Sequence, residues 1–213
     1  MTMPRQILPG STYLVSRRCS ERRFFLGPDN FVGQVFLYVL GCTAALLGIH
    51  LHAATVVSNH YHMCVTDTRG WLPRLVALVV KAERGIPENV WSTDKTSIVR
   101  LETPEDVLAA MVYVRMQAVR AVLVERAGDW PGLSTAPRQL LEPAVRVSRP
   151  TAYFSPSGRK PADTAVPFTI PPGRDARPEC SATQQPGPCR LGSLLVNWPA
   201  EAPASSTNRL GAN

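Results

Sequence analysis

The chain has 213 residues, of which 45% are hydrophobic, and these values are ordinary for a globular protein. Its five cysteines are odd in number and form no CxxC pair, which argues against a disulfide framework and a zinc knuckle. The net charge of +7 permits a polyanionic partner such as nucleic acid, although a mildly basic soluble protein has the same charge.

The N-terminus lacks the apolar core of a signal peptide. The longest apolar stretch, residues 35–49, is too short and too interrupted by glycine to span a bilayer. We therefore expect a cytoplasmic protein with no membrane partner.

The prolines are unevenly distributed along the chain. Residues 131–213 hold 14 of the 20 prolines, whereas most aliphatic residues precede position 131. This contrast predicts one folded domain over residues 1–140, followed by a Pro-rich, largely irregular tail over residues 141–213.

The first half of the chain alternates between strand and helix signals. Residues 11–19 alternate and are rich in β-formers, which predicts a strand. Residues 27–48 open with Pro-Asp, carry apolar residues at helical spacing and end at Gly48, which predicts a helix. The following elements are expected to be a strand over 49–57, a turn at Ser58-Asn59, a strand over 60–67, a short helix over 71–85 and a strand over 92–101.

The clearest element is a helix predicted over residues 103–128. Thr103 is its N-cap, Pro104 occupies the first helical position, and Gly128 marks its end. The resulting order, β-α-β-β-α-β-α, predicts an α+β fold. Its core is a ferredoxin-like split βαβ antiparallel sheet with helices on one face, to which a long C-terminal helix and a disordered tail are added.

The segment HYH, residues 60–62, places two histidines two positions apart on a predicted strand. Residues at this spacing share a face, about 7 Å apart, while Tyr61 points the other way into the core. Two neutral imidazoles so placed can bind one divalent ion and leave open positions for a substrate oxygen. The alternative is that both rings simply lie on the solvated side of the sheet.

The last predicted helix supplies possible partners for this histidine pair. Tyr113 and Gln117 stand one turn apart, at the flank of an apolar stripe. The phenol can act as a nucleophile, and the amide oxygen can bind Mg²⁺ or Mn²⁺. The stripe itself comprises Val107, Ala110, Met111, Val114, Ala118 and Val122.

Four separated stretches together resemble the single-tyrosine HUH transposases, in particular the REP-associated tyrosine transposases of bacteria. HUH denotes His-hydrophobic-His, which residues 60–62 match, and the resemblance covers roughly residues 5–135. The stretches are LPGSTYLVSRRCSERRFFL, LHAATVVSNHYHMCVTD, WSTDKTSIVRL and VLVERAGDWPGLS.

The resemblance implies a metal-dependent endonuclease and strand transferase that acts on single-stranded or hairpin DNA through a 5′-phosphotyrosine intermediate. Carried over by position, His60 and His62 become ligands of Mg²⁺ or Mn²⁺, Tyr113 the nucleophile, and Gln117 the third ligand or a helper. REP-associated members usually have Asn then Pro where this chain has Gln117-Ala118, and Gln is the pattern of the insertion-sequence relatives. A homodimer is possible in such a family.

Basic residues flank the predicted site. We expect DNA-backbone contacts from a set of cations, although each is also ordinary surface charge by itself: Arg17, Arg18, Arg22, Arg23, Lys95, Arg115 and Arg120. Phe24 and Phe25 follow the first cluster and can stack bases or pack in the core.

Two other classes of protein stay open at this stage. One is a DNA-binding protein that keeps the fold without the cutting activity. The other is a histidine-rich metal-binding protein, because His50 and His52 form a second HxH on the neighbouring strand. Four histidine ligands would occupy the coordination positions that catalysis needs, so one residue of the second pair is expected to pack or to support the site rather than to bind metal.

Overall fold

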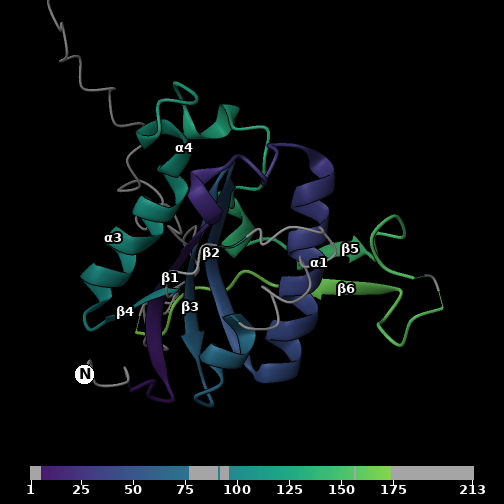
Figure 1. Ribbon diagram of the computed structural model, residues 1–213. Coiled ribbons are helices and arrows are strands. Elements are labelled where there is room, and N and C mark those ends of the chain that lie inside the picture. The colour runs from purple at the N-terminus through teal and green to yellow at the C-terminus, as the bar shows by residue number, and fades with distance from the viewer. Residues whose placement is uncertain (1–5, 77–90, 92–95, 156, 174–213) are drawn as a thin grey trace, which may run out of the picture.

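The computed structural model describes residues 6–76, 91, 96–155 and 157–173 (Figure 1). Four strands form one antiparallel sheet in the order β2-β3-β1-β4. The strands are β1 (Ser11–Arg18), β2 (Ile49–Val57), β3 (His60–Asp67) and β4 (Ser97–Leu101). The helices with described bounds are α1 (Asn30–Leu47), α3 (Pro104–Arg115) and α4 (Gln117–Arg120). The 3₁₀ segments are η1 (Ser20–Arg22), η3 (Ala127–Asp129) and η4 (Pro137–Leu140), and residues 72–76 are also helical.

The sheet is the α+β arrangement that the element order predicts. β3 lies between β1 and β2 and is antiparallel to both, while β4 pairs with the other edge of β1. α1 connects β1 to β2, so these elements form a split βαβ unit. Residues 72–76 are helical as predicted, whereas the rest of the predicted 71–85 helix and the beginning of the 92–101 strand lie outside the described residues.

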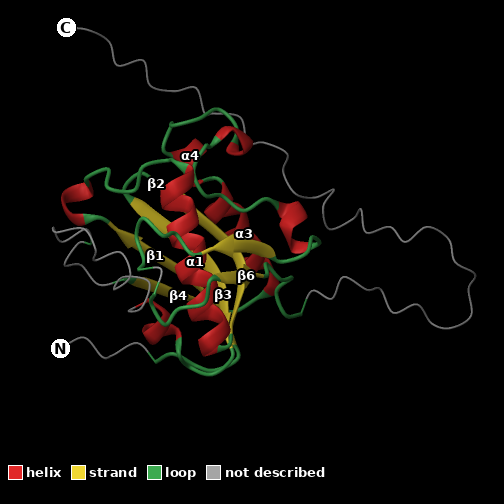
Figure 2. Cartoon of the chain, turned by 90° about the vertical axis from the view of Figure 1, so that its right-hand side faces the viewer, coloured by secondary structure: helices red, strands yellow, loops and turns green. Residues whose placement is uncertain are grey.

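Helices cover both faces of the sheet. In Figure 1 the sheet lies between α3 and α1, and Figure 2 shows α1 crossing in front of the strands. On the α1 face the main core gathers Tyr13, Val15 and Tyr61, together with Leu72 and Leu75. The predicted additional helix, α3, packs on the opposite face, in a cluster that includes Ala53, Cys64, Val107, Ala110, Met111 and Val114.

Local signals define α1. The Asp29 carboxylate accepts a hydrogen bond from the backbone N–H of Val32 at 2.7 Å, which caps the first turn. Gly48 ends the helix in the left-handed conformation, with φ 67°. By length and composition α1 is apolar enough to cross a membrane, with a mean hydropathy of 1.6, and half of it is buried inside the fold.

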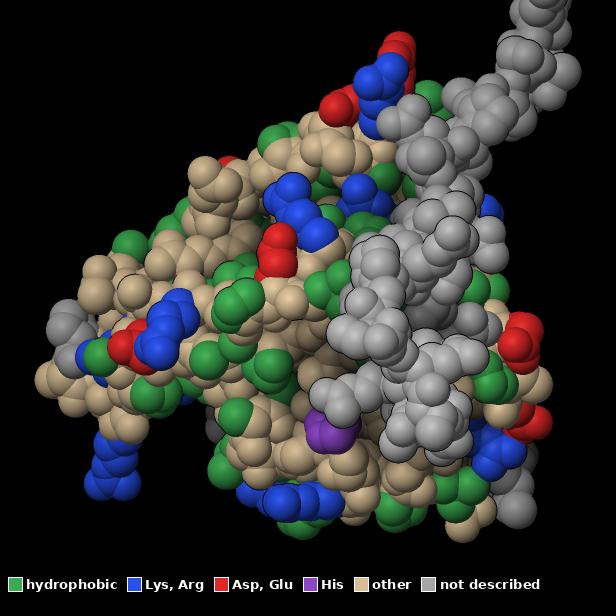
Figure 3. All heavy atoms as spheres, turned by 180° about the vertical axis from the view of Figure 1, so that it is seen from behind, with side chains coloured by type: hydrophobic (Ala, Val, Ile, Leu, Met, Phe, Trp, Pro, Cys, Tyr) green, Lys and Arg blue, Asp and Glu red, His purple; other side chains and the backbone are tan. Residues whose placement is uncertain are grey.

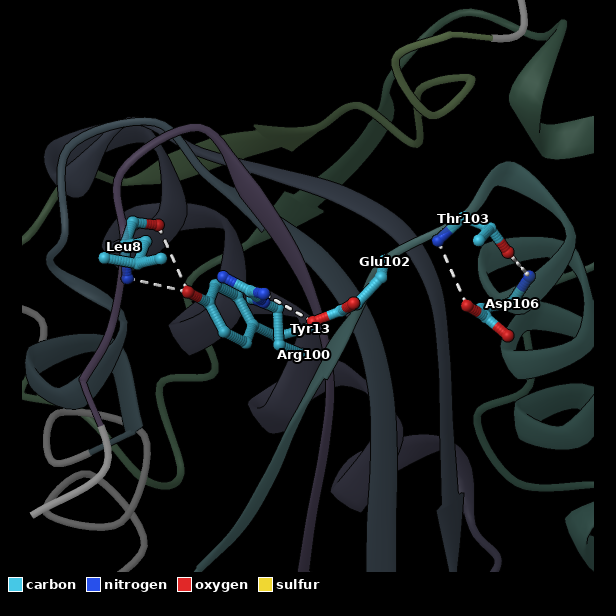
Figure 4. Close-up of polar contacts among 6 residues, drawn as sticks. All are labelled: Leu8, Tyr13, Arg100, Glu102, Thr103 and Asp106. Atoms are coloured by element: carbon cyan, nitrogen blue, oxygen red, sulfur yellow. Dashed lines mark hydrogen bonds and ion pairs between the residues drawn. The ribbon is translucent and has the colours of Figure 1, made fainter. Parts of the chain in front are cut away.

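The prediction of one long helix over residues 103–128 is wrong beyond Arg115. Its start is as expected, because Thr103 and Asp106 form a reciprocal capping box (Figure 4). α3 then ends at Arg115, α4 covers one turn, and Val122 takes a positive φ of 57°. Trp130 donates to the Val56 carbonyl at 3.0 Å and packs with Val57, which draws the chain back over β2.

The expectation of a largely irregular tail after residue 140 is wrong for part of that segment. β5 (Val145–Ser148) and β6 (Asp163–Val166) pair as a two-stranded sheet beside α1 (Figure 1). Val147, Val166 and Phe168 belong to the main core. The folded unit therefore extends past residue 140, and residues 174–213 lie outside the described residues.

Two connecting segments cover the outer edge of β2. The backbone N–H of Val56 donates to the Leu133 carbonyl at 2.9 Å, and that of Thr169 donates to the Leu51 carbonyl at 2.8 Å. Paired in this way, β2 presents fewer free backbone groups to solvent. The opposite edge of the sheet is β4.

Candidate active site

The histidine pair lies on the face of the sheet that α3 covers. His60 and His62 both belong to β3, and their ring centroids are 4.9 Å apart with the rings nearly perpendicular. His62 is buried and His60 is half-buried. Tyr61 points to the other face, where it is fully buried against Phe36 and Trp91, as the alternation of the strand predicts.

Both imidazoles are held neutral near pH 7. Burial lowers the pKa of His62 to about 3, and the His60 ring, when it is protonated, and the Arg18 guanidinium act in the same direction. Burial also lowers the pKa of His60, although a hydrogen bond between the ring and the Gln117 side chain partly opposes this shift. A neutral ring keeps a lone pair available for a cation.

Neighbouring amides fix the orientation of His60. Its Nδ1 lies 2.5 Å from Oδ1 of Asn59, which can only accept, so Nδ1 carries the proton and Nε2 carries the lone pair. The Gln117 side chain also interacts with the His60 ring, and its Nε2 donates to the backbone carbonyl of Tyr113 at 2.9 Å. Gln117 is buried, although α3 ends just before it.

Tyr113 lies directly against the histidine pair. Its ring centroid is 5.3 Å from that of His62, in an edge-to-face arrangement. The guanidinium of Arg120 lies over the outer face of the phenol, 5.3 Å from the ring centroid. Tyr113 and Arg120 also line a groove of about 1130 Å³ between α3, β4 and residues 116–125, so the phenol is accessible to a large ligand.

The structure separates the cations that the sequence grouped together. Arg18 pairs with His60 across the β1–β3 ladder and lies on the histidine face, as does Arg120. Arg17 lies on the opposite face, where it donates to Thr96 and stacks on Trp91. Arg22 and Arg23 are exposed at the corner after β1, and Lys95 lies outside the described residues.

Arg115 does not join the site. Its guanidinium donates to the Thr135 carbonyl at 3.0 Å, and burial lowers its pKa. It therefore holds the loop beside β2 rather than facing Tyr113. On the face seen in Figure 3, Lys and Arg side chains occur in separate groups, some of them beside acidic side chains, and not in one patch.

The second histidine pair is remote from the first. His50 is exposed, whereas His52 is buried at a bulge of β2. Both nitrogens of His52 are engaged, Nδ1 with the Thr169 carbonyl and Nε2 with Oγ1 of Thr66, each at 2.7 Å. A site of four histidines is therefore not formed, which disfavours the histidine-rich metal-binding protein.

Sequence reasoning missed three polar neighbours of the histidines. Ser16 and Thr55 are the cross-strand partners of His62 in β1 and β2, so they share its face of the sheet. Asn59 was expected only to set the turn, yet it also orients His60. The turn signal could have suggested Asn59, whereas the other two follow from strand register alone.

The residues present fit a divalent cation. Within the described ranges no three His, Cys, Asp or Glu residues cluster, so the candidate donors are two imidazoles and the amide oxygen of Gln117 beside them. Among the same residues, Nδ1 of His62 is buried without a hydrogen-bond partner. Such an atom is costly to leave unpaired, and a bound cation would supply its partner.

Comparison with solved structures defines the class of fold. The four-stranded antiparallel sheet with its helices has a transposase-like fold, similar to that of the REP-associated tyrosine transposases that the sequence motifs indicated. One solved protein with a similar fold is a REP-associated tyrosine transposase bound to a REP hairpin. It is 16% identical to this chain, with a TM-score of 0.58 over 80% of this chain and 94% of its own.

A second solved chain, a candidate transposase from Deinococcus radiodurans, is also 16% identical over 58% of this chain and 92% of its own. Its TM-score of 0.37 is too low to carry an argument. No protein-family model and no curated protein sequence matches the chain. The likeness is therefore one of fold, and activity has to be argued from the residues.

Proposed function

We propose that the protein is a metal-dependent single-stranded DNA endonuclease and strand transferase of the single-tyrosine HUH type. The observation that carries the proposal is the contact between the Tyr113 ring and His62, beside a second neutral histidine. A nucleophile and a pair of neutral nitrogen donors thus lie within reach of one phosphate group.

Each residue of the candidate site has a role in this proposal. His60, His62 and the amide oxygen of Gln117 would hold Mg²⁺ or Mn²⁺, which supplies Lewis acidity and charge neutralisation at the phosphate when bound. Asn59 fixes the tautomer of His60. Arg120 lies over the Tyr113 ring, where its guanidinium would contact the phosphate that the phenol oxygen attacks.

The reaction is a transesterification. The phenol oxygen of Tyr113 attacks the phosphorus and forms a Tyr–O–P bond to the phosphate, which stays on the 5′ end of the downstream strand. The P–O3′ bond breaks, and the leaving 3′ oxygen takes up a proton from solvent in place of the one that the phenol gives up. The covalent link conserves the phosphoester bond, so a second 3′-OH can later attack it and rejoin the strand.

The proposed substrate is single-stranded or hairpin DNA. The similar solved protein carries a REP hairpin, and this chain has a net charge of +7. Tyr113 contacts a histidine of its own chain, so the proposed site is complete without a second copy. Residues 1–140, together with the packed strands β5 and β6, would form the unit that binds DNA.

The adduct assay tests this function. The protein is incubated with hairpin-bearing single-stranded DNA and Mn²⁺, and a denaturant-stable protein–DNA adduct is expected on a gel. Tyr113→Phe removes only the nucleophilic oxygen and is expected to abolish the adduct. Tyr153→Phe, which changes a tyrosine in the turn after β5, is the matched control and should leave the adduct intact.

Two results would contradict the proposal. An adduct that persists in Tyr113→Phe would assign the nucleophile elsewhere. DNA binding by the wild-type protein without any adduct would instead support the other class, a DNA-binding protein that retains the fold and has lost the cutting activity.

A further inference from the structure

The segment between β1 and α1 forms a corner beside the histidine pair. We call residues 20–25 the corner loop. Both of its ends attach to the β2–β3 turn: the backbone N–H of Cys19 donates to the Asn59 carbonyl at 2.7 Å, and that of Leu26 donates to the Ser58 carbonyl at 2.9 Å. Cys19 and Leu26 are buried anchors. The two ends of the loop are therefore bonded to Asn59 and Ser58, the two residues that precede His60 in the chain.

The corner loop is held in an unusual backbone conformation. Two consecutive residues, Glu21 and Arg22, have positive φ values of 52° and 57°. Such values are uncommon outside glycine and persist only where the surroundings impose them. Here Nδ2 of Asn59 donates to the Arg22 carbonyl at 3.2 Å. The same Asn59 side chain accepts from His60, so one amide links the loop to the proposed metal ligand.

The two phenylalanines of the loop have opposite environments. Phe25 packs against the main core, whereas Phe24 is 75% exposed. An aromatic ring this exposed contributes little to folding. Its neighbours Arg22 and Arg23 are also exposed, and the ion pair of Arg23 with Glu21 is solvated and therefore weak.

We propose that the corner loop is a stacking site for an unpaired base of a DNA strand whose neighbouring phosphate lies at the histidine pair. Phe24 supplies the ring on which the base stacks, and the Arg22 and Arg23 side chains contact the adjacent phosphates. The inference rests on the proposed function in taking single-stranded DNA as the ligand. It adds the place on the surface at which the strand is recognised.

Charge and shape favour nucleic acid over a protein partner. A lone exposed ring directly after two exposed arginines suits a planar base beside phosphates, whereas a protein interface centres on a contiguous apolar patch. The groove beside Tyr113 is the larger apolar surface, but nothing in the structure shows what covers it. The corner loop, in contrast, is physically linked to His60.

The test measures binding without catalysis. A fluorescent 12-nucleotide single strand is titrated with protein in EDTA, and anisotropy gives the dissociation constant. Phe24→Ala is expected to weaken binding about tenfold, within the range for loss of one base–aromatic stack. Phe24→Trp, which keeps a stacking surface, should restore it. Phe31→Ala, which removes another exposed ring at the start of α1, should bind like the wild type.

An abasic strand separates stacking from charge. The same titration with abasic residues in place of the bases keeps every phosphate, so Phe24→Ala should bind it as the wild-type protein does. Equal affinity of Phe24→Ala and wild type for the base-bearing strand would overturn the stacking site, and so would an equal loss on both strands.

The two proposals fail separately. A Tyr113-dependent adduct together with Phe24-independent binding would retain the nuclease and remove the stacking site. Phe24-dependent binding without any adduct would retain the stacking site and remove the nuclease.

Discussion

Burial determines the charge state of three of the four histidines. His52, His60 and His62 all have lowered pKa values because they lie in or beside the core. Two of them form the candidate site, whereas His52 holds the segment after β6 to β2 through its bond to Thr169. Burial thus keeps two histidines neutral at the candidate site, and it keeps His52 neutral where that residue binds the segment after β6.

A pH dependence of stability follows from His52. Burial lowers its pKa from 6.5 to about 4, so between these values the unfolded chain binds a proton that the folded chain refuses. The free energy of unfolding should therefore fall as the pH drops from 6.5 to 4, by up to about 3 kcal/mol from this residue. Urea denaturation at several pH values measures the slope, which should be shallower in His52→Gln.

His50→Gln is the control for that experiment, because it removes an exposed imidazole from the same strand. His62, with a pKa of about 3, adds to the slope in the same direction, so His52→Gln should retain part of it. A slope identical to that of the wild-type protein in His52→Gln would show that Thr66 and Thr169 stabilise the charged ring after all.

At the scale of elements, β6 packs closely against α1 at Gly41. A Cβ added at Gly41 would lie 2.8 Å from Cγ2 of Val166 and 2.9 Å from Cγ2 of Thr164. Both are branched side chains on β6 that cannot swing away. The absence of a side chain at Gly41 is therefore what lets the strand lie on the helix.

Gly41→Ala should destabilise the protein although alanine favours helices. Overpacking costs about 1–3 kcal/mol, which outweighs the gain of about 1 kcal/mol in helix propensity. The matched variant is Gly33→Ala in the same helix, whose Cβ would meet Leu133 at an ordinary 3.7 Å and should be neutral or stabilising. Thermal unfolding of the two variants measures the difference, and an increase in stability for both would contradict the close packing.

At the scale of the whole molecule, β5 and β6 complete the core that α1 begins. Val147, Val166 and Phe168 are buried there, and Thr169 pairs with the edge of β2. The folded unit therefore includes residues after position 140, which the proline content of the sequence assigns to an irregular tail. The position of α1, and through it of the sheet, depends on these later residues.

Truncation tests this dependence. A chain that ends after residue 140 loses three buried apolar side chains, worth about 5 kcal/mol of burial in total. We expect it to unfold at a much lower temperature than a chain that ends after residue 173, or to aggregate through the exposed face of α1. Equal unfolding temperatures for the two chains would show that the folded domain ends near residue 140, as the proline content predicted.

Local signals predicted most of the elements. Capping at Asp29 and Gly48 set the ends of α1, and the turn at Ser58-Asn59 set the hairpin. The stripe on α3 and α4 is buried as predicted except for Val122, which is 89% exposed. The helix ends before Val122, and the chain after it returns to β2, where Trp130 donates to the Val56 carbonyl. A helical pattern in the sequence does not predict a contact with a distant strand.

The sequence by itself determined which residue types were available for chemistry and on which element each would lie. Period and capping are local properties, so the histidine pair, Tyr113 and Gln117 could be assigned to one strand and one helix. Only the tertiary structure decided which side chains meet, because strand register and helix packing depend on contacts between residues far apart in the chain. That is why Arg18 shares the histidine face while Arg17 does not, and why Asn59 links His60 to the corner loop.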